Sequence, residues 1–242
     1  MNRKKPLVVS IGEALWDVFP DESRFGGAPA NVACHVASLG AESVMVSAVG
    51  DDDLGRRAVE SLQSHEVDTA NIDRLSDRET GVVLVQLDTS GKPSYTIKED
   101  VAWDFIAWHS RFEELAAKAD AVCFGTLAQR SRVSHATIRQ FVAAVKPDAL
   151  RFLDINLRAP FYSKELIVQS IGISNILKLS DEELPVVAGF CDIADSDDKP
   201  ESADGKPMTE SRIEELITRL REKFGLKYVV LTRGSEGAMM AS

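Results

Sequence analysis

The sequence has 242 residues, of which 44% are hydrophobic and 27% are charged, proportions typical of soluble globular domains that exclude a collagen-like or a wholly disordered chain. At about 150 residues per domain, this length allows one large α/β core with an appendage. The 28 Lys and Arg residues against 38 Asp and Glu residues give a net charge of −10, so we expect no binding to nucleic acid or to an anionic membrane surface.

Short apolar runs alternate with helical patterns along most of the chain. The expected strands are 7–11, 44–49, 121–124, 151–155, 176–179 and 227–231. The expected helices lie near 29–39, 112–118, 134–145, 164–170, 181–188 and 211–224, and a further one follows the segment 50–55 and runs to about 64. Strands that are apolar on both faces and alternate with helices indicate a parallel sheet covered by helices. We therefore predict an α/β fold with a mostly parallel sheet and helices on its faces.

Two further apolar runs, 82–87 and 94–98, flank a turn-forming sequence at 88–93. This arrangement predicts an antiparallel hairpin. Because the hairpin interrupts the alternation of strands and helices, we expect it to belong to a small second sheet. The segment 192–209 is acidic and poor in large apolar residues, which predicts a mobile surface insertion.

Three cysteines, Cys34, Cys123 and Cys191, stand alone without a paired motif. This usage indicates a reducing compartment, and we expect the cytoplasm. The apolar run at 7–11 is too short for the core of a signal peptide. No segment approaches the roughly 18 consecutive apolar residues of a membrane span.

A pair of glycines precedes the first long expected helix. Gly26 and Gly27 would let a ligand approach the backbone closely, and Asn31 in the first helical turn offers both donors and an acceptor. These groups suit a polyhydroxylated ligand. A Gly-Gly turn that simply precedes a helix is the alternative interpretation.

Acidic residues occupy two further positions of interest. Asp51 and Asp52 follow an expected strand, at the edge where open α/β sheets bind ligands, although capping of the next helix by Asp51, Asp52 or Asp53 also explains them. Asp17 stands in an otherwise apolar strand, where an unpaired carboxylate would cost several kcal/mol. We therefore expect Asp17 to have either a structural partner or a function.

Two later strands end in charged residues. The polar residues from Asp154 to Arg158 close one strand and could hold a phosphate or a metal-bound water. Lys178 and Glu183 repeat the arrangement one strand later. Ser180 and Glu183 also have the spacing of a capping box, so a structural interpretation stays open for this pair.

The loop from Thr232 to Gly237 follows the last expected strand and has flexible points at Gly234 and Gly237. It is not a P-loop, and no GxGxxG follows the first strand, which disfavours a nicotinamide-dependent oxidoreductase. The four histidines lack metal-ligand spacing. The aromatic residues within 103–108 are interpreted as a packing element or a pocket wall.

In their order along the chain, these motifs resemble the ribokinase-like sugar kinases of the phosphofructokinase-B type, and among them the fructokinases. The matching segments are Gly12-Glu13 with Asp17, 26–33, 49–52 with Gly55, 80–81, 154–158, 178–183 and 231–237. Their joint order is far more specific than any single motif. Many members of the family have Asn where Ser180 stands, and a Ser there resembles the fructokinase variant.

The resemblance implies transfer of the γ-phosphoryl group of ATP to a sugar hydroxyl, with Mg²⁺ as cofactor. It implies a three-layer α/β domain with a small β lid from about 13–25 and 80–107, through which a homodimer could form. Contacts with sugar hydroxyls would come from Asp17, Gly26, Gly27, Asn31 and Asp51. Near the transferring phosphoryl group it places Arg158, which is the catalytic residue present in the chain, together with Lys178 and Glu183. Glu183 would contact Mg²⁺ through water. Near the nucleotide it places Thr232, Gly234 and Gly237.

The sequence departs from the family in one respect. The family's catalytic base is an Asp in a Gly-Ala-Gly-Asp segment, beyond the Thr-x-Gly loop, whose backbone N–H groups also form the anion hole. This segment does not occur in the 242 residues. Loss of both features should remove nearly all turnover. We therefore expect either a truncated kinase or a non-catalytic sugar-binding remnant, and the residues 237–242, which resemble a hairpin cut early in its return strand, favour truncation.

Overall fold

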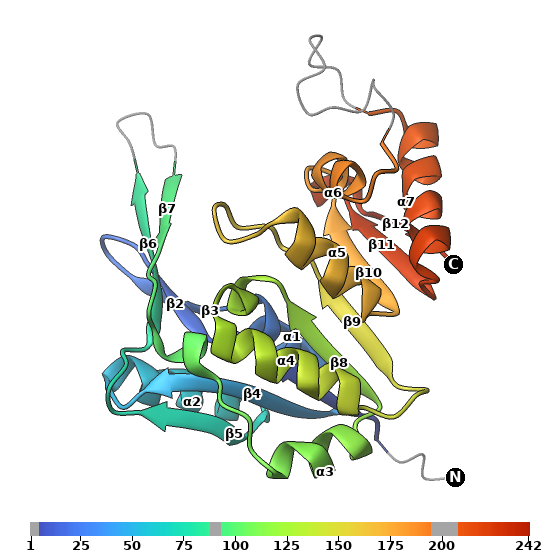
Figure 1. Ribbon diagram of the computed structural model, residues 1–242. Coiled ribbons are helices and arrows are strands. Elements are labelled where there is room, and N and C mark those ends of the chain that lie inside the picture. Colours follow the sequence, from blue (N-terminus) through green and yellow to red (C-terminus); the bar gives the residue numbers. More distant parts are fainter. Residues whose placement is uncertain (1–4, 88–92, 195–207) are drawn as a thin grey trace. The chain divides into compact units, whose positions relative to one another are not determined.

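The computed structural model describes residues 5–87, 93–194 and 208–242. The chain divides into two compact units, Met1–Ala149 and Leu150–Ser242 (Figure 1). Most of the predicted insertion at 192–209, and the predicted turn at 88–92, lie outside the described residues. Within the described ranges, no helix has both the length and the apolar character that a membrane crossing requires.

The first unit is built on parallel strands. These are β1 (Leu7–Ile11), β4 (Glu42–Gly50), β5 (Asp68–Leu75) and β8 (Ala121–Gly125), in the order β8-β1-β4-β5. Val9 of β1 is in register with Val44 of β4 on one side and with Val122 of β8 on the other. All three valines are buried, as the apolar runs predict.

Helices cover this sheet. They are α1 (Ala28–Ser38), α2 (Asp53–Ser64), α3 (Arg111–Lys118) and α4 (Arg132–Ala144). The helices α1 and α2 contact each other and β4, α3 contacts α4, and Figure 1 shows α1 and α4 on opposite faces of the sheet. In α2, Ala58, Val59 and Leu62 are buried whereas Arg56 and Glu60 are exposed, which is the pattern of an amphipathic helix.

A second, smaller sheet belongs to the same unit. Its strands are β2 (Leu15–Val18), β3 (Ser23–Gly26), β6 (Gly81–Leu87) and β7 (Pro93–Ile97), in the order β3-β2-β6-β7. The strands β6 and β7 are antiparallel, so the predicted hairpin is confirmed, and Figure 1 shows it projecting from the main sheet. The strand β2 pairs with β6 in parallel, which joins the hairpin to a distant part of the sequence.

Two segments of the first unit differ from the prediction. The strand β5 was not expected, because 68–75 shows no regular alternation and most of its residues are only partly buried at the edge of the sheet. Within the range 80–107 assigned to lid strands, Ala102–Phe105 forms the 3₁₀ helix η1, which contacts β4 and α4. Trp103 of η1 is fully buried.

The second unit has the strands β9 (Leu150–Asp154), β10 (Ile176–Ser180), β11 (Tyr228–Thr232) and β12 (Ala238–Ala241), in the order β12-β11-β10-β9. The first three are parallel, and β12 runs antiparallel to β11 as the predicted return strand. The helices are α5 (Lys164–Gly172), α6 (Leu184–Phe190) and α7 (Glu210–Phe224). The helix α7 packs on β11 and β12, and α6 contacts both α5 and α7.

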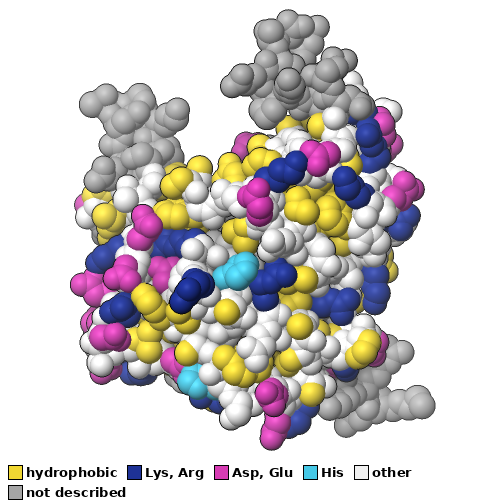
Figure 2. Space-filling model, in the orientation of Figure 1, with side chains coloured by type: hydrophobic (Ala, Val, Ile, Leu, Met, Phe, Trp, Pro, Cys, Tyr) yellow, Lys and Arg dark blue, Asp and Glu magenta, His cyan; other side chains and the backbone are white. Residues whose placement is uncertain are grey.

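The surface carries charges of both signs. On the face shown in Figure 2, acidic and basic side chains are interspersed among apolar ones. Ion pairs such as Arg56–Glu60 and Lys118–Glu114 join residues one helical turn apart. Exposed pairs of this kind contribute only about 0.3–0.5 kcal/mol each. Because the two signs are interspersed, this face shows no continuous acidic patch (Figure 2).

Candidate functional site

The two glycines lie where β3 meets α1. Gly27 has a φ of 108°, and a Cβ there would lie 2.4 Å from the carbonyl oxygen of Glu13, so only glycine fits. The carbonyl of Gly27 accepts a hydrogen bond from the Asn31 N–H at 2.9 Å, and Asn31 is exposed on the first turn of α1. No side chain caps α1 and its first turn has no acidic residue. The start of this helix therefore presents the exposed Asn31 amide, without a competing side-chain cap, to an incoming ligand.

Asp17 lies on the small sheet beside these glycines. In β2, Leu15 pairs with Gly26 of β3, so Asp17, two residues further on, shares a face of the sheet with Gly26. A Cβ at Gly26 would lie only 2.9 Å from the Asp17 Oδ2. The glycine thus leaves room for the carboxylate. The structure brings Asp17, Gly26 and Gly27 together, which the sequence motifs predicted.

The acidic residues after β4 have separate roles. Asp52 is the N-cap of α2, and its carboxylate accepts hydrogen bonds from the Gly55 N–H at 2.7 Å, the Thr80 N–H at 2.8 Å and the Thr80 hydroxyl at 2.7 Å. Capping therefore belongs to Asp52. Asp51 is exposed at the carboxyl end of β4, and its side chain makes no hydrogen bond or ion pair within the described part of the chain. This leaves Asp51 accessible to a ligand.

Replacement of Asp52 by alanine should lower the free energy of unfolding by about 1–2 kcal/mol through the lost cap. Burial alone would raise the pKa of the Asp52 carboxyl, but the hydrogen bonds from Thr80 and Gly55 together lower it below its ordinary value of 3.8. A lowered pKa in the folded state stabilises the protein above that ordinary value, and this contribution disappears as the pH falls through the folded pKa. The difference between wild type and Asp52→Ala in urea denaturation should therefore shrink below pH 3.8.

Asp53→Ala is the matched control for this prediction. Asp53 is the next residue along and is exposed, and its one ion pair among the described residues is with Arg56 on the helix surface. Replacement of Asp53 by alanine should lower the free energy of unfolding by less than about 0.5 kcal/mol. An equal loss of stability in the Asp52 and Asp53 variants would contradict the role of Asp52 as the cap.

Charged groups of the second unit meet at the carboxyl ends of β9 and β10. Asp154 and Lys178 are in register, and the Lys178 Nζ lies 3.0 Å from Oδ1 and 3.2 Å from Oδ2 of Asp154. Burial raises the pKa of the Asp154 carboxyl above its ordinary value, although the Lys178 ammonium acts in the opposite direction. Arg158 is exposed and its Nη1 donates to the Leu157 carbonyl at 2.9 Å. Two cations therefore lie at this edge, one held by a carboxylate and one accessible.

Glu183 is held by the backbone of both strand ends. Its Oε1 accepts a hydrogen bond from the Leu157 N–H at 2.6 Å, and its Oε2 accepts one from the Ser180 N–H at 2.8 Å. The Ser180 hydroxyl in turn accepts from the Glu183 N–H at 3.2 Å, so the reciprocal hydrogen bonds of a capping box are present. The predicted start of the helix at 181 is wrong, because this exchange closes a turn and α6 begins only at Leu184.

The residues of the second unit fit Mg²⁺ only as an ion brought by a ligand. Among the described residues, no group of three or more His, Cys, Asp or Glu side chains could hold a metal ion. Mg²⁺ is commonly held by one or two carboxylates together with phosphate oxygens and water. Since each carboxylate oxygen of Glu183 already accepts a backbone hydrogen bond, this side chain fits contact with Mg²⁺ through water.

The loop after β11 adjoins the same sheet edge, because Thr232 is in register with Ser180. The Thr232 hydroxyl donates to the Leu179 carbonyl at 3.4 Å. The next five residues form a tight turn that includes the 3₁₀ helix η4 (Gly234–Glu236) and is closed by a hydrogen bond from the N–H of residue 233 to the Gly237 carbonyl at 2.8 Å. Gly234 and Gly237 both have positive φ, at 52° and 91°. The predicted nucleotide loop and the charged strand ends are thus neighbours within the second unit.

Sequence reasoning missed one buried ion pair. Asp104 and Arg130, whose side chains are only 5% and 7% exposed, lie 2.9 Å apart in the first unit. They belong to different elements and to no recognised motif, so their pairing had no signal in the spacing. The only available signal was the charge of Asp104 within the apolar run from 101 to 106.

Comparison with known proteins gives relatives along nearly the whole chain. Residues 6–242 match the family described as pfkB family carbohydrate kinase. An uncharacterised sugar kinase of Pyrococcus horikoshii is 31% identical over 201 residues, which cover 76% of this chain and 64% of that protein. The fructokinase of Salmonella typhimurium is 27% identical over 253 residues, which cover 100% of this chain and 74% of that protein. The chain therefore spans about two thirds to three quarters of the length of these relatives.

Solved structures share the fold. Fructokinase from Vibrio cholerae in its apo form has a TM-score of 0.78 and 24% identity, covering 98% of this chain and 78% of that chain. The Pyrococcus horikoshii sugar kinase in complex with ATP has a TM-score of 0.72 and 26% identity, covering 97% of this chain and 74% of that chain. These similarities confirm the predicted α/β fold.

Proposed function

Because this chain belongs to the pfkB family of carbohydrate kinases, we propose that it acts as a fructokinase-type kinase, which transfers the γ-phosphoryl group of ATP to a sugar hydroxyl. The observation that carries the proposal is the grouping of Asp17, Gly26 and Gly27 beside the uncapped start of α1. A carboxylate and the exposed Asn31 amide beside it suit a ligand rich in hydroxyls. The relationship to the Salmonella fructokinase supports a hexose as substrate.

We assign the sugar to the first unit. The Asp17 and Asp51 carboxylates would accept hydrogen bonds from sugar hydroxyls, and the Asn31 amide would both donate and accept. Gly26 leaves space beside Asp17, and Gly27 lets the chain turn close to Glu13. Charge-assisted hydrogen bonds of this kind are stronger than neutral ones, so the two carboxylates should dominate sugar affinity.

We assign the nucleotide and its phosphates to the second unit. Thr232, Gly234 and Gly237 would contact the nucleotide, and Arg158 and Lys178 would stabilise charge on the phosphoryl oxygens. Asp154 would orient the Lys178 ammonium at 3.0 Å. Mg²⁺, when bound, neutralises phosphate charge, and Glu183 would contact it through water. The ATP complex of the Pyrococcus horikoshii kinase supports ATP as the donor.

A coupled ADP-release assay on the full-length gene product tests the proposed activity. The substrate panel is fructose, ribose, 2-keto-3-deoxygluconate and nucleosides, each with ATP and Mg²⁺. We expect turnover with fructose above the others, since the carboxylates and Asn31 match a polyhydroxylated ligand. Omission of Mg²⁺ should abolish the signal. Absence of turnover with every substrate would refute the proposed activity.

A second candidate function is sugar binding without turnover by the 242-residue polypeptide. It is favoured by the absence of a Gly-Ala-Gly-Asp sequence from these residues. Calorimetric titration with fructose, run beside the ADP-release assay on the same polypeptide, separates the two candidates. Heat of binding without ADP release supports the second, and ADP release supports the first.

We also propose that the protein is located in the cytoplasm and that it forms a homodimer through the small sheet. The family resemblance is the reason for the dimer, and the unpaired cysteines are the reason for the location. Light scattering coupled to size exclusion would measure the mass of the protein directly. A monomer at all concentrations would refute the dimer.

A further inference from the structure

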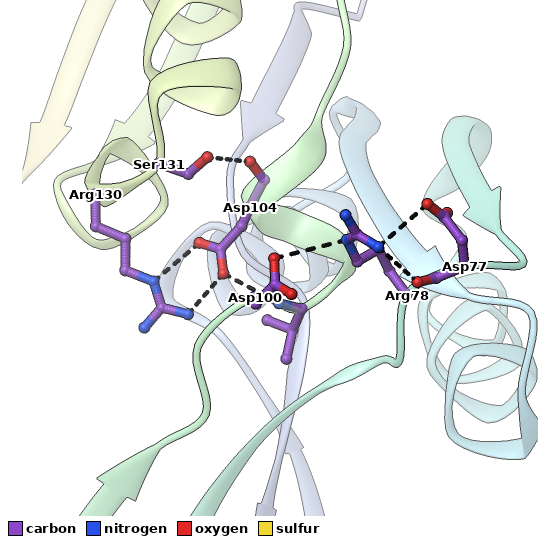
Figure 3. A network of polar contacts seen from close by, with 7 residues as sticks. Asp77, Arg78, Asp100, Asp104, Arg130 and Ser131 are labelled. Carbon is purple, nitrogen blue, oxygen red and sulfur yellow. Dashed lines mark hydrogen bonds and ion pairs between the residues drawn. The ribbon is translucent and has the colours of Figure 1, made fainter.

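The hairpin β6–β7 is attached to the first unit by two connections that contact each other. Before β6, the Glu79 carbonyl accepts a hydrogen bond at 2.8 Å from the N–H of Ala102, which follows β7. The side chains of Glu79 and Lys98 form an ion pair across the same gap. Arg78 and Asp100 form another, with Nε and Oδ1 3.7 Å apart (Figure 3). The two ends of the hairpin are therefore held to each other.

Arg130 holds this pair of connections from the side. It ends the 3₁₀ helix η2 (Leu127–Arg130), and its Nε and Nη2 each donate to one carboxylate oxygen of Asp104 at 2.9 Å (Figure 3). The same Nη2 donates to the Lys98 carbonyl at 2.6 Å, directly after β7. The planar guanidinium thus fixes two partners at once, which the point charge of a lysine would not do.

Arg130 also reaches the start of β6 through Trp103. Its guanidinium carbon lies 4.0 Å from the centre of the Trp103 ring. Trp103 is fully buried, and a Cβ at Gly81 would lie 2.0 Å from its Nε1. The indole therefore abuts the first residue of β6 and has no space in which to shift. One guanidinium therefore contacts the residue after β7 directly and the first residue of β6 through Trp103.

The hairpin in turn carries the strand that bears Asp17. In the small sheet, Asp17 of β2 pairs with Val83 of β6, and Leu15 pairs with Gly81. A shift of β6 relative to the main sheet would therefore move β2 and the Asp17 carboxylate with it. A second attachment, from Asp52 to Thr80, lies on the other side of the start of β6.

We propose that Arg130 is a positioning residue for sugar binding, which acts through Asp104, Trp103 and the hairpin to hold Asp17 in place. The inference rests on the proposed function, because it takes Asp17 as a sugar ligand. A buried ion pair is weak support for stability, since desolvation offsets much of its attraction. The two parallel hydrogen bonds between Arg130 and Asp104, in contrast, restrict the orientation of Asp104 relative to η2. A fixed orientation at this contact would keep the small sheet in one position.

Arg130→Lys tests the proposal by keeping the charge and removing the bidentate geometry. If the variant holds the small sheet in its binding position a tenth of the time, fructose affinity measured by calorimetry falls about tenfold. ATP affinity should stay at the wild-type value. Hydrogen exchange should become faster in 81–87 and 15–18, the strands that the contact holds.

Arg111→Lys is the matched control. Arg111 pairs with Asp73 at 2.7 Å in the same unit, between α3 and β5, away from the hairpin. The control should leave both fructose affinity and the exchange of β6 unchanged. If Arg130→Lys keeps wild-type fructose affinity, or if the control loses as much, the positioning role is overturned.

Two further measurements keep the test decisive. Should Arg130→Lys fail to fold, the double variant Arg130→Met, Asp104→Asn removes both buried charges together and should show the same selective loss of fructose affinity. If wild type itself binds none of the panel sugars, the proposed function fails. The exchange data then stand alone, and unchanged exchange in 81–87 of the Arg130 variant refutes its control of the small sheet.

Discussion

Replacement of Asp17 by alanine should weaken sugar binding at least about tenfold and leave ATP binding unchanged, because a hydrogen bond to a charged group contributes about 1.5–3 kcal/mol. The carboxylate lies on the small sheet beside Gly26, whose lack of a side chain leaves room for its Oδ2. Nucleotide contacts are assigned to other residues, so the effect should be selective. Calorimetric titration of the folded variant with fructose and with ATP measures both affinities.

Asp21→Ala is the control for this experiment. Asp21 is an exposed carboxylate in the connection between β2 and β3. Asp21 lies close to Asp17 in sequence, and its replacement by alanine removes the same charge. Long-range electrostatic effects should therefore be alike in the two variants. Wild-type fructose affinity in a folded Asp17→Ala protein would remove Asp17 from the site. Equal losses in the two variants would point to net charge as the cause.

Replacement of Gly27 by alanine should be the most destabilising single methyl addition in the site, on the order of 3 kcal/mol. The new Cβ would lie 2.4 Å from the Glu13 carbonyl oxygen, and the φ of 108° is unfavourable for any residue with a side chain. This steric clash can be removed only if the backbone of residue 13 or the start of α1 moves. A lower midpoint of urea denaturation, with an unchanged slope, would report this loss.

Gly172→Ala adds the same methyl group where there is room. Gly172 ends α5, its φ is not positive, and no atom lies within 4 Å of the added Cβ. This variant should be neutral or more stable by about 0.4–1 kcal/mol, because alanine has less freedom in the unfolded chain. A Gly27→Ala protein as stable as Gly172→Ala would show that the loop near Glu13 adapts freely.

The buried strands and the hairpin could be predicted because their signals are local. Apolar runs such as 7–11 and 121–124 are long enough to identify as buried strands, and the turn sequence at 88–93 separates two apolar segments. The strand β5 escaped prediction because it lies at an edge, where its residues are only partly buried and need not alternate. The 3₁₀ helix η1 escaped because a single short turn has no periodicity.

The sequence offered candidate site residues, but not the structural partner of each one. Three consecutive aspartates could each have capped α2, and only the structure shows that Thr80 selects Asp52. Likewise, the spacing of Ser180 and Glu183 indicated a capping box, but the Leu157 N–H that holds the other carboxylate oxygen lies far away in sequence. Hydrogen bonds between residues far apart in sequence depend on which strands become neighbours in the sheet. The spacing of residues within one motif carries no information about the order of the strands.

The order of strands in the small sheet has a consequence for folding. The neighbours β2 and β6 are separated in sequence by β3, α1, β4, α2 and β5, so their pairing closes a long loop, whereas β6–β7 and β2–β3 are local hairpins. Closing such a loop is entropically costly until the intervening elements have condensed. During synthesis, the β2–β3 hairpin must therefore wait, with one edge unpaired, until β6 has emerged. Asp17 therefore acquires its final surroundings only after β6 has emerged, so binding of a sugar by this carboxylate requires a strand that is made more than sixty residues later.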